Sequence, residues 1–422
     1  MTARWEVVPP LLLALVVIVV VARAFGLLAR RLGQPAVIGE ILGGILLGPT
    51  LFGGALTRAV FPAEIRPTLA TVANVGVVLF MFLVGRELDR DLLRGQGRIA
   101  ASVSLSAIAL PFALGAVLAW YLLGNHPAGN RLAFVLFLGT AMSITAFPVL
   151  ARILTDKGLL RTPIGGLALA CASVDDVLAW TLLAVVAALA GAGSVPWQVL
   201  LVVPFALVLL LAVRPLLARA ARRVTRAGRA VRIAGPLAVG AGLWASAYAT
   251  ELMGLHLIFG AFLFGAVVPR GDGPLLSERV VTWMRTACAV LLLPVFFVVA
   301  GIKVNLSSLD GRLIGELALI LLVAIGGKCV GAYTGARLNG IRARHSAVLA
   351  ILMNTRGLTE LIVLTVGLQL GVLDTGMYSL MVVMALVTTA MAGILLPFVY
   401  PERLVRRDRE PRLPAASPEA VP

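Results

Sequence analysis

Apolar runs of about twenty residues recur along the whole chain, and short polar or charged connections separate them. A helix of about 20 residues is long enough to span the hydrocarbon core of a bilayer. Hydrophobic residues make up 60% of the chain and charged residues 13%, which is far more apolar sequence than a soluble core needs. The chain is therefore expected to be an all-α polytopic membrane protein. We count thirteen spans, which begin near residues 9, 36, 69, 99, 132, 162, 197, 233, 255, 283, 313, 346 and 377.

The basic residues give these spans a direction. The formal net charge is +16, but the arginines lie in short connections instead of one basic domain, so they indicate membrane topology and not nucleic-acid binding. Every connection after an odd-numbered span is basic, as at Arg30 and Arg31, whereas the even-numbered connections carry few charges. Positive residues gather on the cytoplasmic side. We expect a multi-pass membrane protein with its N-terminus outside and its C-terminus in the cytoplasm.

Three smaller features bound the organisation. The first run resembles a signal peptide at Ala22-Arg23-Ala24, but the arginine and the lack of a strongly basic start favour a retained helix. Residues 1–400 are expected to form one transmembrane domain, and residues 401–422 a disordered tail too short for a nucleotide-binding module. The cysteines lie inside predicted spans without metal-ligand spacing, so we interpret them as core residues; they are Cys171, Cys288 and Cys329.

Two adjacent acids, Asp175 and Asp176, lie in the middle of the apolar run between residues 162 and 188. Ionisable residues at bilayer depth are costly and mark ion or proton pathways. Neighbours on a helix point about 100° apart, so we expect one carboxylate to face an ion cavity and the other a cationic partner. Lys328 lies at a similar depth and is the expected partner of Asp175, which leaves Asp176 to bind Na⁺ or K⁺. The expected additional ligands are Ser173 and backbone oxygens near Ser143 to Thr145.

Two spans carry helix-breaking or polar residues at mid-depth. The fifth contains Pro148 and the twelfth contains Gly357, and the two spans are seven helices apart, so they run in opposite directions. Paired interruptions of this kind are typical of inverted repeats whose broken helices cross at an ion site. The residues expected in these discontinuous helices are Pro148, Asn354, Thr355, Arg356, Gly357 and Glu360.

Simpler interpretations exist for several of these residues. The two aspartates can be a buried structural pair, and Lys328 can extend its ammonium group toward the cytoplasmic surface. Arg356 and Glu360 have the i, i+4 spacing of a structural ion pair. Ser143 and Thr145 can form hydrogen bonds within their own helix. Glu40 can line a water-filled entrance or simply pair with a basic group. Lys303 can lie at the membrane interface, and His256 and His345 can be helix-end residues.

Five segments together resemble one transporter family: residues 34–49, 82–85, 143–154, 172–180 and 353–361. They are similar to the monovalent cation:proton antiporter superfamily, in its second branch of bacterial antiporters and plant cation/proton exchangers. The resemblance implies a core domain of crossed, unwound helices that moves against a dimerisation domain. It also implies that Asp176 is the main ion and proton ligand, that Lys328 pairs with Asp175, and that an acidic pair accompanies electrogenic exchange. The Kef potassium-efflux systems of this branch carry a C-terminal nucleotide-binding domain, from which this chain departs.

The expected function is secondary antiport of Na⁺ or K⁺ against H⁺ by a homodimer in a bacterial cytoplasmic membrane, without a cofactor and without enzymatic activity. Spans four to six and eleven to thirteen would form the core. An ion-coupled transporter of organic solutes is the first alternative, because it can also use crossed broken helices. A cation channel is the second, although no filter-like stretch is present. A receptor would not need charged groups at matched depths in three helices.

Overall fold

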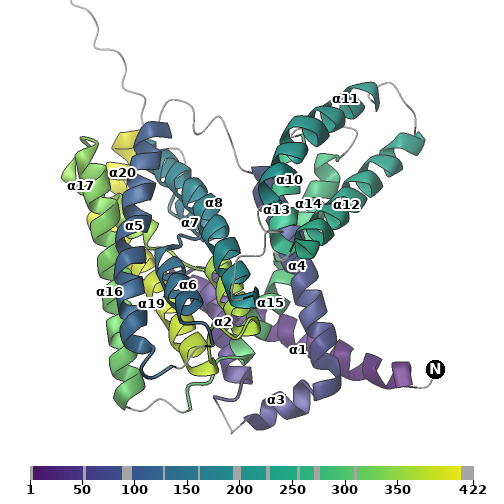
Figure 1. The fold of residues 1–422 in the computed structure, drawn as a ribbon, viewed down its shortest axis with the longest axis horizontal. Coiled ribbons are helices and arrows are strands. Elements are labelled where there is room, and N and C mark those ends of the chain that lie inside the picture. The colour runs from purple at the N-terminus through teal and green to yellow at the C-terminus, as the bar shows by residue number, and fades with distance from the viewer. Residues whose placement is uncertain are drawn as a thin grey trace, which may run out of the picture.

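The computed structural model describes residues 3–50, 54–87, 97–126, 129–159, 162–192, 201–224, 229–253, 257–269, 276–307 and 311–409. Every regular element in these ranges is a helix (Figure 1). The first part of the chain forms α1 (Ala3–Arg31), α2 (Ala36–Leu47), α3 (Ala55–Val60), η2 (Ala63–Ile65), α4 (Arg66–Glu87), α5 (Gly97–Leu122), α6 (Arg131–Ser143), α7 (Phe147–Asp156) and α8 (Pro163–Ala192). The predicted all-α fold is confirmed.

The second part of the chain continues the same pattern. It forms α10 (Val202–Val208), the π-helical η3 (Leu209–Val213), α11 (Arg214–Val224), α12 (Arg229–Leu252), α13 (Leu257–Val267), α14 (Glu278–Ala287), the π-helical η4 (Cys288–Leu292), α15 (Leu293–Ile302), α16 (Gly311–Leu338), α17 (Ala343–Met353), α18 (Leu358–Gln369), α19 (Thr375–Val399) and α20 (Glu402–Arg409). The α-helices before and after each π segment are continuous with it, so η3 and η4 lie inside longer helical stretches.

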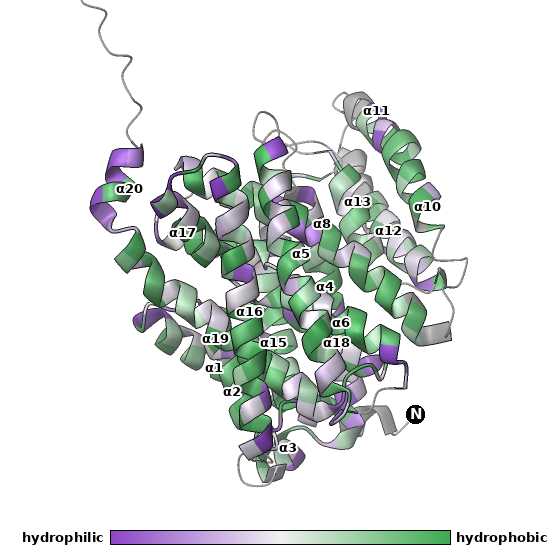
Figure 2. Cartoon of the chain, turned by 60° about the vertical axis from the view of Figure 1, so that its left-hand side comes forward, coloured by the Kyte–Doolittle hydropathy of each residue, from purple (hydrophilic) through white to green (hydrophobic). Residues whose placement is uncertain are grey.

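Eight helical stretches within the described ranges are long and apolar enough to cross a membrane, and α17 with α18 adds a ninth that bends by 42°. Three further helices, α2, α6 and α13, are apolar but shorter. The polytopic membrane character is therefore confirmed, while the count of thirteen crossings stays a prediction. Hydrophilic segments gather near α20, α17 and α3, and apolar helices lie between them (Figure 2). That distribution is the one expected of a bundle with two aqueous ends.

The helices pack in two groups. In the first, α5 contacts α6, α8 and α16, and α17 contacts α8, α16 and α19. In the second, α4 contacts α13 and α15, and α2 contacts α1 and α15. Contacts between α15 and α18 and between α2 and α19 join the groups. The broken helices lie in the first group (Figure 1).

Glycine allows the backbones of several helices to approach closely. A Cβ atom added at Gly85 of α4 would lie 2.1 Å from the carbonyl oxygen of Phe262, and one at Gly265 of α13 would lie 2.1 Å from that of Phe82. In the first group, a Cβ at Gly331 of α16 would lie 2.4 Å from the carbonyl oxygen of Ser106 in α5. Small residues at helix contacts are the usual source of tight packing where water supplies no hydrophobic driving force.

Helix ends in the first group are fixed by side-chain caps. The Asn130 side chain accepts a hydrogen bond from the amide of Ala133, 3.1 Å away, at the start of α6. Asp374 accepts one from the amide of Met377, 2.7 Å away, at the start of α19. These caps satisfy amides that a helix start leaves unpaired.

Candidate functional site

Two helices break and cross in the middle of the first group. The chain leaves helical geometry at residues 144–146, between α6 and α7, and at residues 354–357, between α17 and α18. The amide of Ala146 donates a 3.0 Å hydrogen bond to the carbonyl oxygen of Thr355, so the two unwound segments are joined through their backbones. Pro148 is the second residue of α7, where the missing amide hydrogen has no cost. This is the crossing expected from the paired interruptions.

Gly357 brings the two broken helices close together. A Cβ atom at this position would lie 2.4 Å from Cγ2 of Val149 in α7. A larger residue would push α18 away from α7 at the point where the unwound segments meet. The glycine therefore matters here for its lack of a side chain, in addition to weakening the helix.

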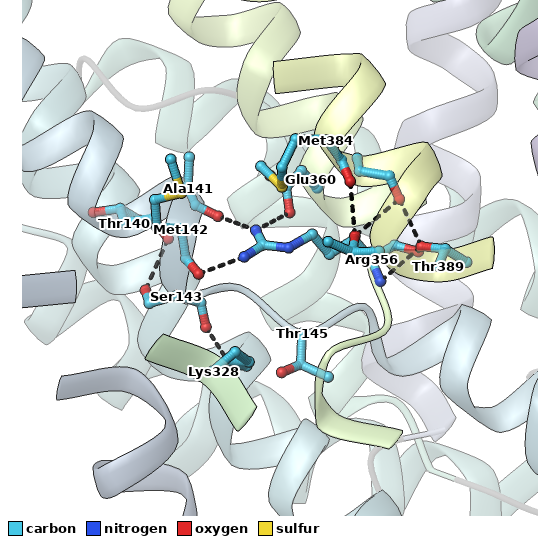
Figure 3. Close-up of polar contacts among 12 residues, drawn as sticks. Thr140, Ala141, Met142, Ser143, Thr145, Lys328, Arg356, Glu360, Met384 and Thr389 are labelled. Carbon is cyan, nitrogen blue, oxygen red and sulfur yellow. Dashed lines mark hydrogen bonds and ion pairs between the residues drawn. The ribbon is translucent and has the colours of Figure 1, made fainter. Parts of the chain in front are cut away.

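The carboxyl end of α6 faces two cations (Figure 3). Arg356 donates hydrogen bonds to the carbonyl oxygens of Ala141, 2.5 Å away, and Met142, 2.6 Å away. The Lys328 ammonium group donates to the next carbonyl oxygen, that of Ser143. A helix carboxyl end carries partial negative charge and unpaired carbonyl groups. Both are satisfied here by positive side chains from other segments, in a place that water does not reach.

Asp175 and Lys328 form a fully buried ion pair, with Nζ 2.9 Å from Oδ2 of the aspartate. The Thr145 hydroxyl lies 2.7 Å from the same carboxylate oxygen and 2.9 Å from the carbonyl oxygen of Met353. A buried carboxylate needs a counter-charge and hydrogen bonds to remain ionised. Lys328 thus turns inward to Asp175 and not toward the membrane surface.

Asp176 has a different environment from its neighbour. It is 2% exposed, and neither carboxylate oxygen has a hydrogen-bond partner among the described residues. The amide of Phe147, at the amino end of α7, interacts with this carboxylate but does not meet hydrogen-bond geometry. The positive end of the α7 dipole is therefore near an acid with free oxygen atoms. The two adjacent acids therefore differ in their partners within the protein.

The neutral candidate ligands lie in several different positions. The Ser173 hydroxyl donates to the carbonyl oxygen of Leu169 in its own helix, and that of Ser143 donates to Thr140 in the same way. Thr145 contacts Asp175 instead of Asp176. The Asn354 side chain is completely buried, and both its polar atoms lack a partner among the described residues. Among these neutral side chains, the Asn354 amide therefore has an oxygen atom that accepts no hydrogen bond from a described residue.

Arg356 and Glu360 form the i, i+4 ion pair that their spacing indicated, with 2.7 Å between Nη1 and Oε2. Both side chains are fully buried. Thr389 of α19 accepts from the amide of Arg356 at 3.0 Å and donates to its carbonyl oxygen at 2.7 Å. Arg356 thus ties α6, α18 and α19 together around the unwound segment. Sequence reasoning missed Thr389, because a threonine in an apolar run carries no sign of a distant partner.

A second polar cluster escaped sequence reasoning altogether. His126 lies 2.6 Å from Oδ2 of Asp374 and 2.9 Å from Oε2 of Glu316, and Asn125 donates to Glu316 at 2.7 Å. This cluster joins the end of α5 to the starts of α16 and α19, far from the crossing.

Three other residues considered from the sequence lie away from the crossing or outside the described ranges. His256 lies outside the described residues. His345 contacts Asp408 at 3.0 Å, and Lys303 is the C-cap of α15.

A cavity of about 450 Å³ lies between the two helix groups. Val149 and Leu358 line it from the first group, next to the unwound segments, and Glu40 of α2 lines it from the second. Arg23 and Arg30 of α1 also border it, and no other acidic residue does. Glu40 therefore combines the two interpretations of its sequence position: it lines a cavity and lies near basic groups.

Comparison with known proteins agrees with this architecture. Residues 13–400 match the family described as sodium/hydrogen exchanger, transmembrane. The chain is 39% identical over 400 residues to the Na⁺/H⁺ antiporter NhaS4 of a Synechocystis strain, a match that covers 92% of this chain and 96% of that one. It is 37% identical to cation/H⁺ antiporter 19 of Arabidopsis thaliana and 34% identical to K⁺/H⁺ antiporter 1 of Saccharomyces cerevisiae. These matches cover 93% and 87% of this chain. The chain spans 50% and 44% of those two longer relatives.

The fold is also similar to a solved structure, the sodium proton antiporter MjNhaP1 of Methanocaldococcus jannaschii. The TM-score is 0.65 at 18% sequence identity, and the match covers 96% of this chain and 99% of that one. The family match, the NhaS4 relative and the shared fold support the resemblance inferred from the five sequence segments. The chain belongs to the sodium/hydrogen exchanger family of membrane antiporters.

Proposed function

We propose that this protein exchanges Na⁺ or K⁺ for H⁺ and that Asp176 is the carboxylate for which the two ions compete. Its relatives carry the names of Na⁺/H⁺, K⁺/H⁺ and cation/H⁺ antiporters. The observation that carries the assignment to Asp176 is its buried carboxylate, whose two oxygen atoms lack partners among the described residues. Asp175, one residue away, already has Lys328 and Thr145. The pair is therefore divided into one occupied and one available acid.

Competition follows from the chemistry of a desolvated carboxylate. An ionised group in this environment needs a positive partner, which a proton or an alkali cation can supply. Either ligand removes the negative charge, and the second is then no longer attracted. If the empty, charged site cannot cross the membrane barrier while both loaded forms can, exchange is obligatory. Asn354 is the neutral oxygen donor that we assign to the cation at this site.

The packing supports a division into a moving core and a fixed scaffold. The core would consist of α5 to α8 and α16 to α19, which hold the crossing, and the scaffold of the second helix group, through which two copies would form a homodimer. A rigid core is expected, because Arg356, Lys328 and the Ala146 to Thr355 hydrogen bond tie its broken helices together. We assign the route to the site from one side of the membrane to the cavity beside Val149, because this cavity is lined by residues next to the unwound segments. The basic connections support placing that side in the cytoplasm of a bacterial cell.

The charge balance bears on electrogenicity. The buried charged groups around the crossing are three acids and two cations. They are Asp175, Asp176 and Glu360, and Lys328 and Arg356. Arginine keeps its proton, whereas lysine can lose one when its partner changes. Lys328 is thus a second group able to exchange a proton in the cycle, and we propose electrogenic exchange on this basis.

The test is proton movement in everted membrane vesicles that contain Asp176→Asn. Addition of Na⁺, K⁺ or Li⁺ should release protons from vesicles that contain the wild-type protein. In vesicles that contain the variant, proton release should fall to the level of vesicles without the protein. The amide keeps the size of the side chain but cannot carry a negative charge. Undiminished cation-driven proton movement in this variant would refute the role of Asp176.

Glu402→Gln supplies the matched control. Glu402 lies in α20 with a side chain 91% exposed, and its substitution removes one negative charge far from the crossing. Activity near the wild-type level is expected. Stimulation of proton movement by monovalent cations alone also separates antiport from solute symport, which would require an organic substrate.

A further inference from the structure

A groove of about 660 Å³ lies at the end of the bundle that carries α3 (Figure 1). Its lining comes from α3, from the start of α4 and from the end of α15. Three cationic side chains border it, Arg58, Arg66 and Lys303, and no acidic residue does. Apart from Thr57, every other lining residue is apolar or glycine. Charge and apolar surface therefore occur together in one depression.

The basic groups of this groove lie at the expected level of lipid headgroups. Lys303 directly follows the candidate span Glu278–Ile302, and Arg66 lies in the first turn of α4. Most basic residues of the chain belong to the opposite end of the bundle, which the topology prediction assigns to the cytoplasm. Basic residues gathered at this end are thus not explained by topology.

The apolar part of the groove lies deeper. Ala70 follows Arg66 by four residues in α4, and Val299 precedes Lys303 by four residues in α15. Four residues of helix correspond to about 6 Å along the axis. A ligand with an anionic head and an apolar tail would match both levels at once. Inorganic phosphate would use only the upper one.

The groove has a fixed framework. The Thr57 hydroxyl donates to the carbonyl oxygen of Leu47 at 2.6 Å, and Nε of Arg66 donates to that of Phe61 at 2.9 Å. The Thr50 hydroxyl bonds to the backbone of residues 304 and 306. These contacts hold α3 and the end of α15 in place without using the Lys303 ammonium group, for which the described residues include no acidic partner.

Lys303 is partly desolvated. Burial lowers the pKa of its ammonium group, because the charged form loses hydration that no described acid replaces. A phosphate group would restore that stabilisation. An anion is therefore favoured beside Lys303, at the headgroup level of the groove.

We propose that this groove binds an anionic phospholipid, with its phosphate between Lys303 and Arg66 and an acyl chain along Ala70 and Val299. The site is separate from the crossing of the broken helices and does not depend on the exchange reaction. A lipid bound there would bridge α4 and α15, two helices of the second group.

The test is native mass spectrometry of the purified full chain with phosphatidylglycerol and, separately, phosphatidylcholine of the same acyl chains. Phosphatidylglycerol should bind more tightly, and Lys303→Gln should weaken it about 5-fold, which corresponds to about 1 kcal/mol for one lipid-facing charge. Lys303→Arg should restore binding. Val299→Trp should weaken both lipids by filling the acyl level, and it provides a second variant that leaves the charges intact.

Arg131→Gln is the control, because Arg131 is an exposed basic residue at the same end of the bundle but borders a different cavity. It should leave phosphatidylglycerol affinity unchanged. Equal binding of the two lipids, or unchanged affinity in Lys303→Gln, would overturn the proposal. Thermal stabilisation by inorganic phosphate as large as that by phosphatidylglycerol would also overturn it, because the groove would then be a site for a soluble anion.

Discussion

At the scale of single residues, the two adjacent aspartates have opposite surroundings. A helix turns about 100° per residue, so one carboxylate meets Lys328 and Thr145 while the other remains without a partner. Sequence reasoning could predict that the two would differ, since two neighbours on a helix cannot both point toward the expected partner Lys328. It could not decide the direction in which Thr145 points, because that depends on the rotation of the unwound segment. Backbone oxygens near Thr145 were expected to help Asp176 bind the cation, and the structure in addition brings the Thr145 hydroxyl against Asp175.

The buried pair of Asp175 and Lys328 should show strong coupling in stability. Removal of one partner leaves an uncompensated charge in a dry site, which costs about 3–5 kcal/mol, whereas removal of both does not. Asp175→Asn and Lys328→Gln are therefore each expected to lower the thermal midpoint of the purified protein, and the double variant should recover much of the loss. The measurement is thermal unfolding of all four proteins in one detergent. Additive losses would show that the two groups are not energetically coupled.

At the scale of helices, the two interruptions were predictable and their consequences were not. Pro148 and Gly357 mark the breaks in the sequence, and the opposite direction of the two spans follows from counting connections. The contacts that fix the crossing join residues far apart in the chain, such as Arg356 with Ala141 and with Thr389. Nothing in a local pattern identifies such partners. The same limit explains why the His126 cluster was missed.

The His126 cluster is expected to make stability depend on pH. Hydrogen bonding to Asp374 raises the pKa of His126 above its ordinary value of 6.5, and Glu316 adds to this effect while burial opposes it. Burial raises the pKa of Asp374, but bonds from His126 and from backbone amides outweigh it and leave that pKa lowered. A raised pKa in the folded state stabilises the protein fully below pH 6.5. The stabilisation is lost as the pH rises through the folded-state value.

His126→Gln should therefore lower the thermal midpoint most at about pH 6 and least at alkaline pH. The loss at low pH is expected to be about 1.5–3 kcal/mol, as for hydrogen bonds to charged groups. Thermal unfolding of wild type and variant between pH 5.5 and 9 tests this. Asp374→Asn keeps the helix cap, because asparagine caps as well as aspartate, and should flatten the same pH dependence. A gap that widens toward alkaline pH would contradict the assignment.

At the scale of the whole molecule, the cavity between the two helix groups lies next to the crossing, where Val149 and Leu358 line it. Composition and run length were sufficient to predict a polytopic helical bundle, because a chain this apolar has few other ways to satisfy its backbone in lipid. The shape of the space between the groups depends on the packing of many side chains and left no local signal. Glu40 could be placed in the second span from sequence, but its position in this cavity required the assembled structure.

Glu40→Gln should impair cation capture more than turnover. The cavity lining contains Arg23 and Arg30 besides Glu40, so neutralising Glu40 would make an already positive lining more positive. A difference of about 1 kcal/mol in cation attraction corresponds to roughly 5-fold in affinity. We expect the KM for Na⁺ or K⁺ to rise by about that factor while the maximal rate changes little. Cation titrations in vesicles that expose the cavity side measure both parameters. Glu64→Gln, an exposed acid at the opposite end, should leave both unchanged, and a fall in maximal rate alone for Glu40→Gln would argue against capture.

The hydrogen bond between Ala146 and Thr355 uses main-chain atoms only. Mutation of either side chain leaves its donor and acceptor in place, and only proline at position 146 would delete the donor. This one link between the broken helices is therefore insensitive to the side chains at positions 146 and 355. Ion preference can change during evolution, one ligand at a time, while this main-chain contact is retained.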